Sequence, residues 1–305
     1  MVPPIFRLNR EARHGSDRRC QWTNSTEKVA IVTGATSGIG ARIAERFVTE
    51  GARVVAAGRR EAEGRSLEAK CRSAISFIRT DVSDEASVKA MVDHAVMKYG
   101  RLDCLVNNAG SGSPMVSIAE VATEHFSSIF DTNVRGVMFA MKHAAPIMIS
   151  QGSGSIITIG SAAGLRGGLS GHIYSASKAA VIHLSRCVAA ELSRKGVRVN
   201  TISPGGIVTD IFVKSAGLDG ARLNRFLGAL SDLFATAQPI QRAGVTDDIA
   251  NAAIFLAGDA SSFITGQDLA VDGGLVPVGK IGWEEAVDLR AEIARRLREQ
   301  NEPLG

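Results

Sequence analysis

The sequence predicts a single α/β domain, built as a doubly wound parallel sheet of about seven strands with helices on both faces. From residue 28 onward, short apolar runs alternate with longer stretches whose apolar residues recur at helical spacing. The strand-like runs are largely apolar, which is typical of strands covered on both faces. No linker interrupts this alternation, so one domain is favoured over two.

The predicted strands are short and rich in β-branched and other apolar residues. The first reads Val-Ala-Ile-Val-Thr and leads directly into a glycine-rich turn. Right-handed crossovers between such strands produce the doubly wound arrangement. The predicted strands span residues 29–33, 53–57, 76–79, 102–106, 155–159, 197–202 and 268–271.

The predicted helices follow from apolar residues at helical spacing and from the residues that end them. Gly51 and Gly100 each end a helix, and Pro146 is expected to bend or end the longest one near its C-terminus. The predicted helices span residues 40–50, 85–99, 124–150, 175–194 and 247–256.

Two terminal segments lie outside the predicted catalytic domain of residues 27–276. Residues 1–26 are rich in arginine and lack hydrophobic periodicity. They predict a disordered N-terminal extension, with a transit peptide as the alternative. Residues 277–305 form a C-terminal extension in which a charged amphipathic helix is predicted over 280–300. This helix could cover a neighbouring subunit or the mouth of the active site.

The composition narrows the class of protein. The formal net charge is +4 and the pI is near 9.0, but no long Lys/Arg stripe with interleaved aromatics occurs, so no nucleic-acid partner is expected. No apolar run reaches the roughly 18 residues of a membrane span. The four cysteines form no C-x-x-C pair and have no zinc spacing, so no metal site is expected. Free thiols fit a reducing, cytoplasmic location.

A glycine-rich loop joins the first strand to the first helix. Its glycines Gly34, Gly38 and Gly40 have the spacing G-x-x-x-G-x-G. We expect Gly34 to permit the sharp turn, Gly38 to let the backbone approach a pyrophosphate, and Gly40 to allow close packing of helix on sheet. Free amides at the helix N-terminus would then meet the negative charge of the phosphates. The loop therefore predicts a Rossmann-type dinucleotide site.

The end of the second strand indicates which dinucleotide is bound. A carboxylate there would select NAD by holding the ribose 2′-hydroxyl. Gly58 stands at this position, and Arg59 and Arg60 follow it. Two guanidiniums without a carboxylate favour the 2′-phosphate of NADP(H), and NAD(H) is kept as the alternative.

Tyr174 and Lys178 lie four residues apart on a predicted helix. Residues at this spacing share one helix face, so an ammonium would lie beside a phenol. A nearby cation favours the phenolate and brings the tyrosine pKa toward neutral pH. The pair therefore predicts a general acid/base that moves a proton on and off an alcohol oxygen.

Five motifs occur in an order that resembles the short-chain dehydrogenase/reductase family. They are the glycine loop, Asn107-Asn108-Ala109-Gly110 with Asn133, Ser161, Tyr174-x-x-x-Lys178, and Pro204-Gly205. The resemblance covers roughly residues 27–276. It implies a Rossmann-type fold and an NAD(P)-dependent oxidoreductase that acts on CH–OH donors.

The resemblance also implies the roles of individual residues. Tyr174 matches the catalytic acid/base, Lys178 the residue that lowers its pKa and binds the nicotinamide ribose, and Ser161 the hydroxyl that holds the substrate oxygen. Asn133 matches the residue that anchors a water for proton relay. The residues expected to bind the cofactor are Gly34, Thr36, Ser37, Gly38, Ile39, Gly40, Arg59, Arg60, Asp81, Val82, Asn108, Ala109, Gly110, Tyr174, Lys178, Pro204, Gly205, Ile207 and Thr209.

Residues 206–243 interrupt the strand–helix alternation where the family has its substrate lid. This segment is rich in leucine, phenylalanine and isoleucine. An apolar lid predicts a hydrophobic or alicyclic substrate, interconverted between secondary alcohol and ketone. The resemblance further implies a homodimer or homotetramer that pairs through the helices at 124–150 and 175–194.

Two alternatives remain open at this point. A 3-oxoacyl-(acyl-carrier-protein) reductase would resemble this chain closely, but such enzymes carry docking arginines where Phe139 and Ala190 stand here. A non-catalytic NADP-binding sensor or scaffold usually loses the tyrosine or the lysine, and both are present.

Overall fold

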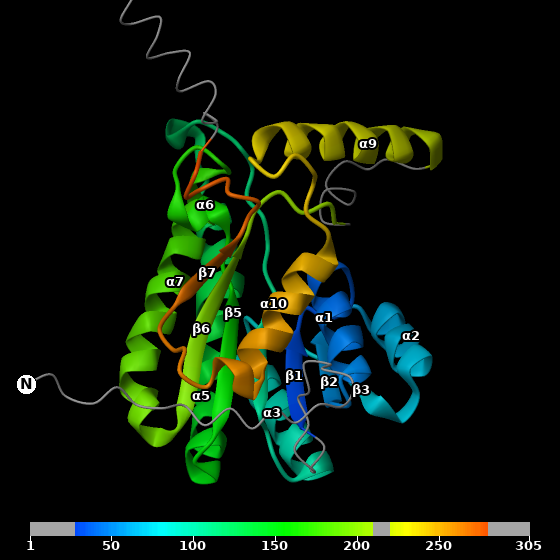
Figure 1. Ribbon diagram of the computed structural model, residues 1–305, viewed down its shortest axis with the longest axis vertical. Coiled ribbons are helices and arrows are strands. Elements are labelled where there is room, and N and C mark those ends of the chain that lie inside the picture. Colours follow the sequence, from blue (N-terminus) through cyan, green and yellow to red (C-terminus); the bar gives the residue numbers. More distant parts are fainter. Residues whose placement is uncertain (1–27, 210–219, 280–305) are drawn as a thin grey trace, which may run out of the picture.

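The computed structural model describes residues 28–209 and 220–279, and its fold is a seven-stranded, all-parallel sheet with helices on both faces (Figure 1). The strand order is β3-β2-β1-β4-β5-β6-β7. The predicted fold class is confirmed. The extension 1–26, the helix predicted over 280–300 and the lid residues 210–219 lie outside the described residues.

Each predicted strand is present, with bounds shifted by at most two residues. Alternate residues of one strand enter two different cores, as the pleat requires. Ala30 and Val32 face one core, whereas Val29 and Ile31 face the other. The strands are β1 (Val29–Thr33), β2 (Arg53–Gly58), β3 (Ile75–Arg79), β4 (Cys104–Asn107), β5 (Gly154–Ile159), β6 (Val197–Pro204) and β7 (Asp268–Val271).

The helices cover the two faces of the sheet. The core around Ala30 includes buried residues of α1, α2 and α10, and the core around Val29 includes those of α3, α5 and α7. The helices are α1 (Gly38–Thr49), α2 (Glu61–Cys71), α3 (Glu85–Tyr99), α4 (Thr123–Phe130), α5 (Gly136–Gln151), α6 (Ala162–Leu165), α7 (His172–Leu192), α9 (Gly220–Ala237) and α10 (Thr246–Ala257).

Helix α2 is absent from the sequence prediction. It buries only Gly64 and Leu67, so it has no apolar stripe that periodicity could reveal. Gly64 is needed because a Cβ there would meet the Phe77 ring at 2.1 Å. Helix α2 is therefore fixed by a close contact with β3 rather than by a broad hydrophobic face.

The helix predicted over 124–150 consists of three pieces. Between α4 and α5, residues Asp131–Arg135 form a π-helical turn, and the helix continues through Pro146 to Gln151. Pro146 lies inside the last turns of α5, which ends at Gln151, one residue beyond the predicted end. A π turn widens the helix locally and is frequent at functional sites.

Helix α9 lies within the predicted lid. It crosses the top of the view in Figure 1, at the end of the molecule where α6 also lies. One of its faces carries the partly buried Phe226, Leu230 and Phe234 at spacings of four residues. This periodicity describes an amphipathic helix within the segment predicted as an apolar lid, for which no helix was predicted.

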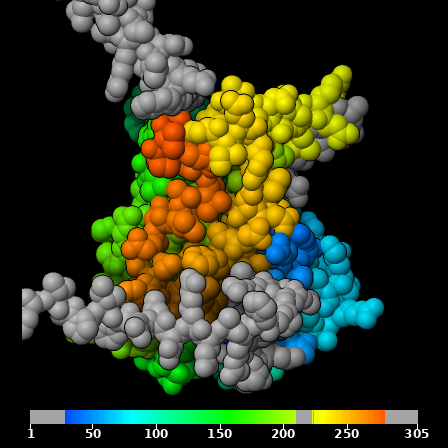
Figure 2. All heavy atoms as spheres, in the orientation of Figure 1, coloured from blue at the N-terminus to red at the C-terminus, as the bar shows by residue number. Residues whose placement is uncertain are grey.

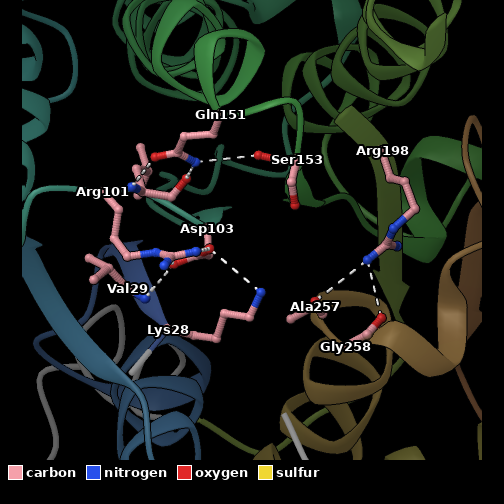
Figure 3. A network of polar contacts seen from close by, with 10 residues as sticks. Lys28, Val29, Arg101, Asp103, Gln151, Ser153, Arg198, Ala257 and Gly258 are labelled. Carbon is pink, nitrogen blue, oxygen red and sulfur yellow. Dashed lines mark hydrogen bonds and ion pairs between the residues drawn. The ribbon is translucent and has the colours of Figure 1, made fainter. Parts of the chain in front are cut away.

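A polar network stabilises the amino edge of the sheet, where the parallel strands begin (Figure 3). The buried Asp103 accepts a hydrogen bond from the Val29 N–H at 2.9 Å and is paired with Arg101 at 2.6 Å. Gln151 both accepts from the Leu102 N–H and donates to the Leu102 carbonyl. These contacts join the ends of β1, β4 and α5.

Within the two described stretches, no helix combines the length and apolar character that crossing a bilayer requires.

Candidate active site

A cleft of about 450 Å³ opens at the carboxyl edge of the sheet. The strand order reverses between β1 and β4, and open α/β sheets bind ligands at such a switch point. Except for Gly40 and the buried Asn133, every residue predicted for the cofactor or for catalysis lines this cleft. Lining residues that the sequence prediction missed are Gly58, Thr80, Ser111, Thr132, Ile159 and Gly160. Each ends a strand, directly follows one or neighbours a predicted site residue, so the strand ends alone could have indicated most of them.

The glycine loop leaves the N-terminus of α1 free to bind an anion. Gly34 and Gly38 have φ values of +66° and +55°, which favour glycine. The hydroxyl of Ser37 does not cap α1, and the first turn of α1 contains no acidic residue. The amides of this turn therefore suit a phosphate. Gly40 faces away from the cleft, and a Cβ there would meet the Asn108 amide nitrogen at 2.3 Å.

Asn108 and Thr33 hold the glycine loop against the loop that follows β4. The Asn108 amide donates to the carbonyls of Thr33, at 2.9 Å, and of Gly34, at 3.3 Å. The Thr33 hydroxyl accepts from the N–H groups of Asn108 and Ala109, both at 3.0 Å. The two loops therefore form one rigid floor of the cleft.

The far end of the cleft is cationic. The Arg60 guanidinium donates to the hydroxyl of Thr36 at 2.8 Å and to that of Ser37 at 2.5 Å. A Cβ on Gly58 would meet the Thr36 methyl group at 2.8 Å, which explains the glycine at the end of β2. The pKa of Asp81 is lowered, first by its hydrogen bond from Ser83 and also by the nearby Arg59.

Tyr174, Lys178 and Ser161 meet at the other end of the cleft. Helix α7 begins at His172, three residues earlier than predicted, and so carries both Tyr174 and Lys178. The Lys178 Nζ lies 5.7 Å from the centroid of the Tyr174 ring. The Ser161 hydroxyl is hydrogen-bonded to the Tyr174 phenol and also accepts from the Ala163 N–H at 3.1 Å. Ser161 therefore caps α6 and faces Tyr174 at the same time.

The structure differs from the sequence prediction in the pKa of Tyr174. Burial raises it above its ordinary value, and the hydrogen bond with Ser161 only partly opposes this shift. The Lys178 Nζ donates to the Ile159 carbonyl at 2.8 Å. Burial also lowers the pKa of Lys178 to about 8. Burial thus shifts both side chains toward their neutral forms.

Asn133 lies behind the cleft, on the π turn. Its Oδ1 accepts from the Ser111 N–H at 2.7 Å, while its Nδ2 donates to the Ser111 carbonyl and to the Ser177 hydroxyl, both at 3.0 Å. The Ser177 hydroxyl donates to the Tyr174 carbonyl at 2.7 Å. Asn133 thus links the loop after β4 to the helix that carries Tyr174.

Comparisons with known proteins agree with this geometry. A family model described as enoyl-(acyl carrier protein) reductase matches residues 34–276. A (+)-borneol dehydrogenase 2 of Salvia officinalis is 41% identical over 254 residues, which cover 81% of this chain and 88% of the relative. An L-fucose dehydrogenase of Oryctolagus cuniculus is 42% identical over 248 residues, which cover 81% of this chain and 84% of the relative.

A solved structure, ElxO with NADP bound, matches with a TM-score of 0.74 at 32% identity and covers 83% of this chain and 100% of that chain. The chain belongs to the short-chain dehydrogenase/reductase family. The resemblance found in the sequence is confirmed, and with it the prediction of an oxidoreductase that acts on CH–OH donors.

Proposed function

We propose that the cleft binds a nicotinamide coenzyme and that the protein interconverts a secondary alcohol and a ketone. The observation that carries this proposal is the convergence of Tyr174, Ser161 and Lys178 at one end of a cleft whose other end is cationic. The uncapped first turn of α1 lies between the two ends and suits a pyrophosphate. The residues present therefore fit a dinucleotide.

The coenzyme supplies the hydride donor or acceptor. The protein supplies the proton path and the orientation. The Tyr174 phenol gives its proton to the ketone oxygen in reduction and takes it back in oxidation. Ser161 holds the same oxygen from a second side. Lys178, which also lines the cleft, would hold the nicotinamide ribose hydroxyls, and its ammonium would favour the phenolate from there.

We propose a preference for NADP(H) over NAD(H). Arg59 and Arg60 both line the cleft beyond β2, and no carboxylate stands at Gly58. The hydroxyls of Thr36 and Ser37 hold the Arg60 guanidinium in place, so a phosphate on the adenosine ribose would meet an oriented cation.

A hydrophobic or alicyclic substrate fits the lid. The apolar face of α9 formed by Phe226, Leu230 and Phe234 is partly buried, and a Cβ on Gly206 would meet the Phe234 ring at 2.5 Å. The lid therefore places apolar surface against the cleft wall. The relatives named above include enzymes of borneol and of L-fucose, so the choice between an apolar alcohol and a sugar rests on the lid.

We also propose that two copies pair through α4, α5 and α7. Met138 and Phe126 are exposed on this side, and Phe126 stacks on Phe130 at 4.3 Å between ring centroids. Met141, Ile182 and Leu192 on the same helices face the core instead, so only part of the apolar surface of these helices is available. The mass in solution, measured by light scattering, tests this pairing, and a monomer would contradict it.

Titration with NADPH and NADH, followed by a substrate panel with the preferred coenzyme, tests the main proposal. Tighter binding of NADPH and a preference for alicyclic or terpenoid alcohols over sugars would support it. Failure to bind either coenzyme would overturn the proposed function, and a clear preference for sugars would overturn the proposed substrate class.

A further inference from the structure

One wall of the cleft is formed by residues 204–209, which begin with the last residue of β6. Within this wall, the residues that line the cleft are Pro204, Gly205, Ile207 and Thr209. Thr209 approaches the glycine loop, since a Cβ on Gly38 would lie 3.6 Å from the Thr209 Cβ. Beyond the end of β6 the wall has no neighbouring strand in the sheet, so contacts from other elements must hold it in place.

Helix α9 meets this wall at Gly206 through two side chains on one helix face. The Phe234 ring lies over Gly206, whose lack of a side chain permits the contact. Four residues further along, the buried Gln238 accepts a hydrogen bond from the Gly206 N–H through Oε1 at 2.7 Å. Residues at this spacing share a face. The Gln238 N–H donates to the Phe234 carbonyl at 3.1 Å, which extends the helical pattern to Gln238.

The other end of the Gln238 amide holds the turn that follows α9. Its Nε2 donates to the Arg242 carbonyl at 2.9 Å. Beyond this turn, Gly244 pairs with the wall, because its N–H donates to the Gly206 carbonyl at 2.9 Å and its carbonyl accepts from the Val208 N–H at 3.1 Å. The Gln238 amide thus joins Gly206 of the wall to the turn after α9, and Gly244 beyond that turn bonds back to the wall.

The residues after β7 also pack against Gln238. The Ile240 N–H donates to the Gly273 carbonyl at 2.9 Å, and a Cβ on Gly273 would lie 3.3 Å from the Gln238 Cβ. In Figure 2, the atoms of the segment after α9 lie directly against those that follow β7. Because Gln238 is confined in this way, a shift of α9 would also shift the wall to which Gln238 is bonded.

We infer that Gln238 is a positioning residue for coenzyme binding: it fixes the wall 204–209 to the C-terminal end of α9, so that lid and coenzyme site move as one. This inference rests on the proposed function. Gln238 does not line the cleft, and so acts through the Gly206 backbone. Without it, the Gly206 N–H loses its partner and the wall is no longer held in place.

The test compares Gln238→Met with Gln151→Met. Gln151 makes the same kind of two-sided bond to backbone, with the N–H and carbonyl of Leu102, but at the amino edge of the sheet (Figure 3). Three quantities are measured for each: the melting temperature, the Kd for NADPH, and hydrogen exchange of the Gly206 amide in the ligand-free protein. Both variants should melt earlier. Only Q238M should raise the Kd, by about five- to tenfold, and speed exchange at Gly206.

Wild-type Kd and wild-type exchange in Q238M would overturn the inference, as would an equal rise of the Kd in Q151M. If wild-type protein binds neither NADPH nor NADH, the proposed function fails, and exchange at Gly206 still decides the role of Gln238. Should Q238M fail to fold, Q238N retains the amide but is one methylene too short to reach Gly206. The same two readouts and the same directions then apply.

Discussion

The buried position of Lys178 lowers the stability of the fold. Its side chain is buried, and the Ile159 carbonyl is the partner of its amine in the described structure. Burial of an ammonium disfavours its charged form, which lowers the pKa to about 8. An ordinary core position would hold an apolar residue, so the lysine indicates selection for chemistry over stability.

Replacement of Lys178 by Met should change how stability depends on pH. Between pH 8 and 10.5, the unfolded lysine is protonated whereas the folded one is not, so the ligand-free wild type gains stability as the pH rises. Relative to K178M, this gain should total about 3 kcal/mol over that window. Urea unfolding at several pH values measures it. Lys89→Met, at an exposed position on α3, should show no such trend, and a constant difference between wild type and K178M would contradict the prediction.

Arg60→Met should weaken NADPH binding and leave NADH binding nearly unchanged. The guanidinium is held by Thr36 and Ser37, so its loss removes an oriented cation for a 2′-phosphate. The expected rise in the Kd for NADPH is about tenfold or more. Arg65→Met, five residues further along in α2 and outside the cleft, is the matched control. An equal loss for both coenzymes would show that Arg60 does not select between them.

At the scale of elements, close contacts position the helices around the cleft. Gly136 begins α5 directly after the π turn, with ordinary helical φ and ψ of −60° and −40°. A Cβ there would meet the side chain and carbonyl of Val82 at 2.9 Å. Since Val82 lines the cleft, this contact sets the distance between α5 and the part of the cleft that Val82 lines.

Gly136→Ala should therefore lower the free energy of unfolding by about 1–3 kcal/mol, because the added methyl group overpacks the contact with Val82. Gly228→Ala provides the control within α9, where nothing lies within 4 Å of the added Cβ. That change should stabilise the protein by up to about 1 kcal/mol, since alanine is the better helix former. Denaturant melts of both variants test the pair, and a stabilised G136A would refute the packing argument.

The elements also show where sequence periodicity reaches its limit. Strands β1 to β6 were predictable because each is a largely apolar and mostly buried run. Strand β7 was also predicted, although it is only partly buried. Helix α2 was not, because it buries only Gly64 and Leu67. The π turn around Asn133 was not either, since its cause is a set of tertiary hydrogen bonds to Ser111 and Ser177. Such contacts leave no periodic signal in the sequence.

At the scale of the whole molecule, the two edges of the sheet have opposite properties. The amino edge is closed by paired groups such as Asp103 with Arg101 and Gln151 with Leu102 (Figure 3). The carboxyl edge is open, with an uncapped α1 and a cleft. The free amides of α1 and the buried lysine at the carboxyl edge lower the stability of the fold, as functional groups often do. The paired groups at the amino edge add stability that offsets part of this loss.

Most cleft residues could be predicted because parallel strands end at one edge, so motifs far apart in sequence converge there. The directions in which the side chains point could not be predicted from the sequence. The bond of Lys178 to the Ile159 carbonyl and the place of Gln238 depend on neighbours that only the folded chain brings together. The raised pKa of Tyr174 likewise follows from burial, which spacing does not reveal.

Tyr174→Phe tests the proposed chemistry most directly, since it removes the phenol oxygen and keeps the ring. Tyr99 is the only other tyrosine of the chain and lies at the end of α3, so Tyr99→Phe is the matched control. With the best alcohol of the substrate panel, Y174F should lose about 10²–10⁴-fold in turnover and bind NADPH as tightly as the wild type. Y99F should keep both turnover and binding. Undiminished turnover in Y174F, measured beside an unchanged coenzyme Kd, would contradict the role of Tyr174 as the acid/base.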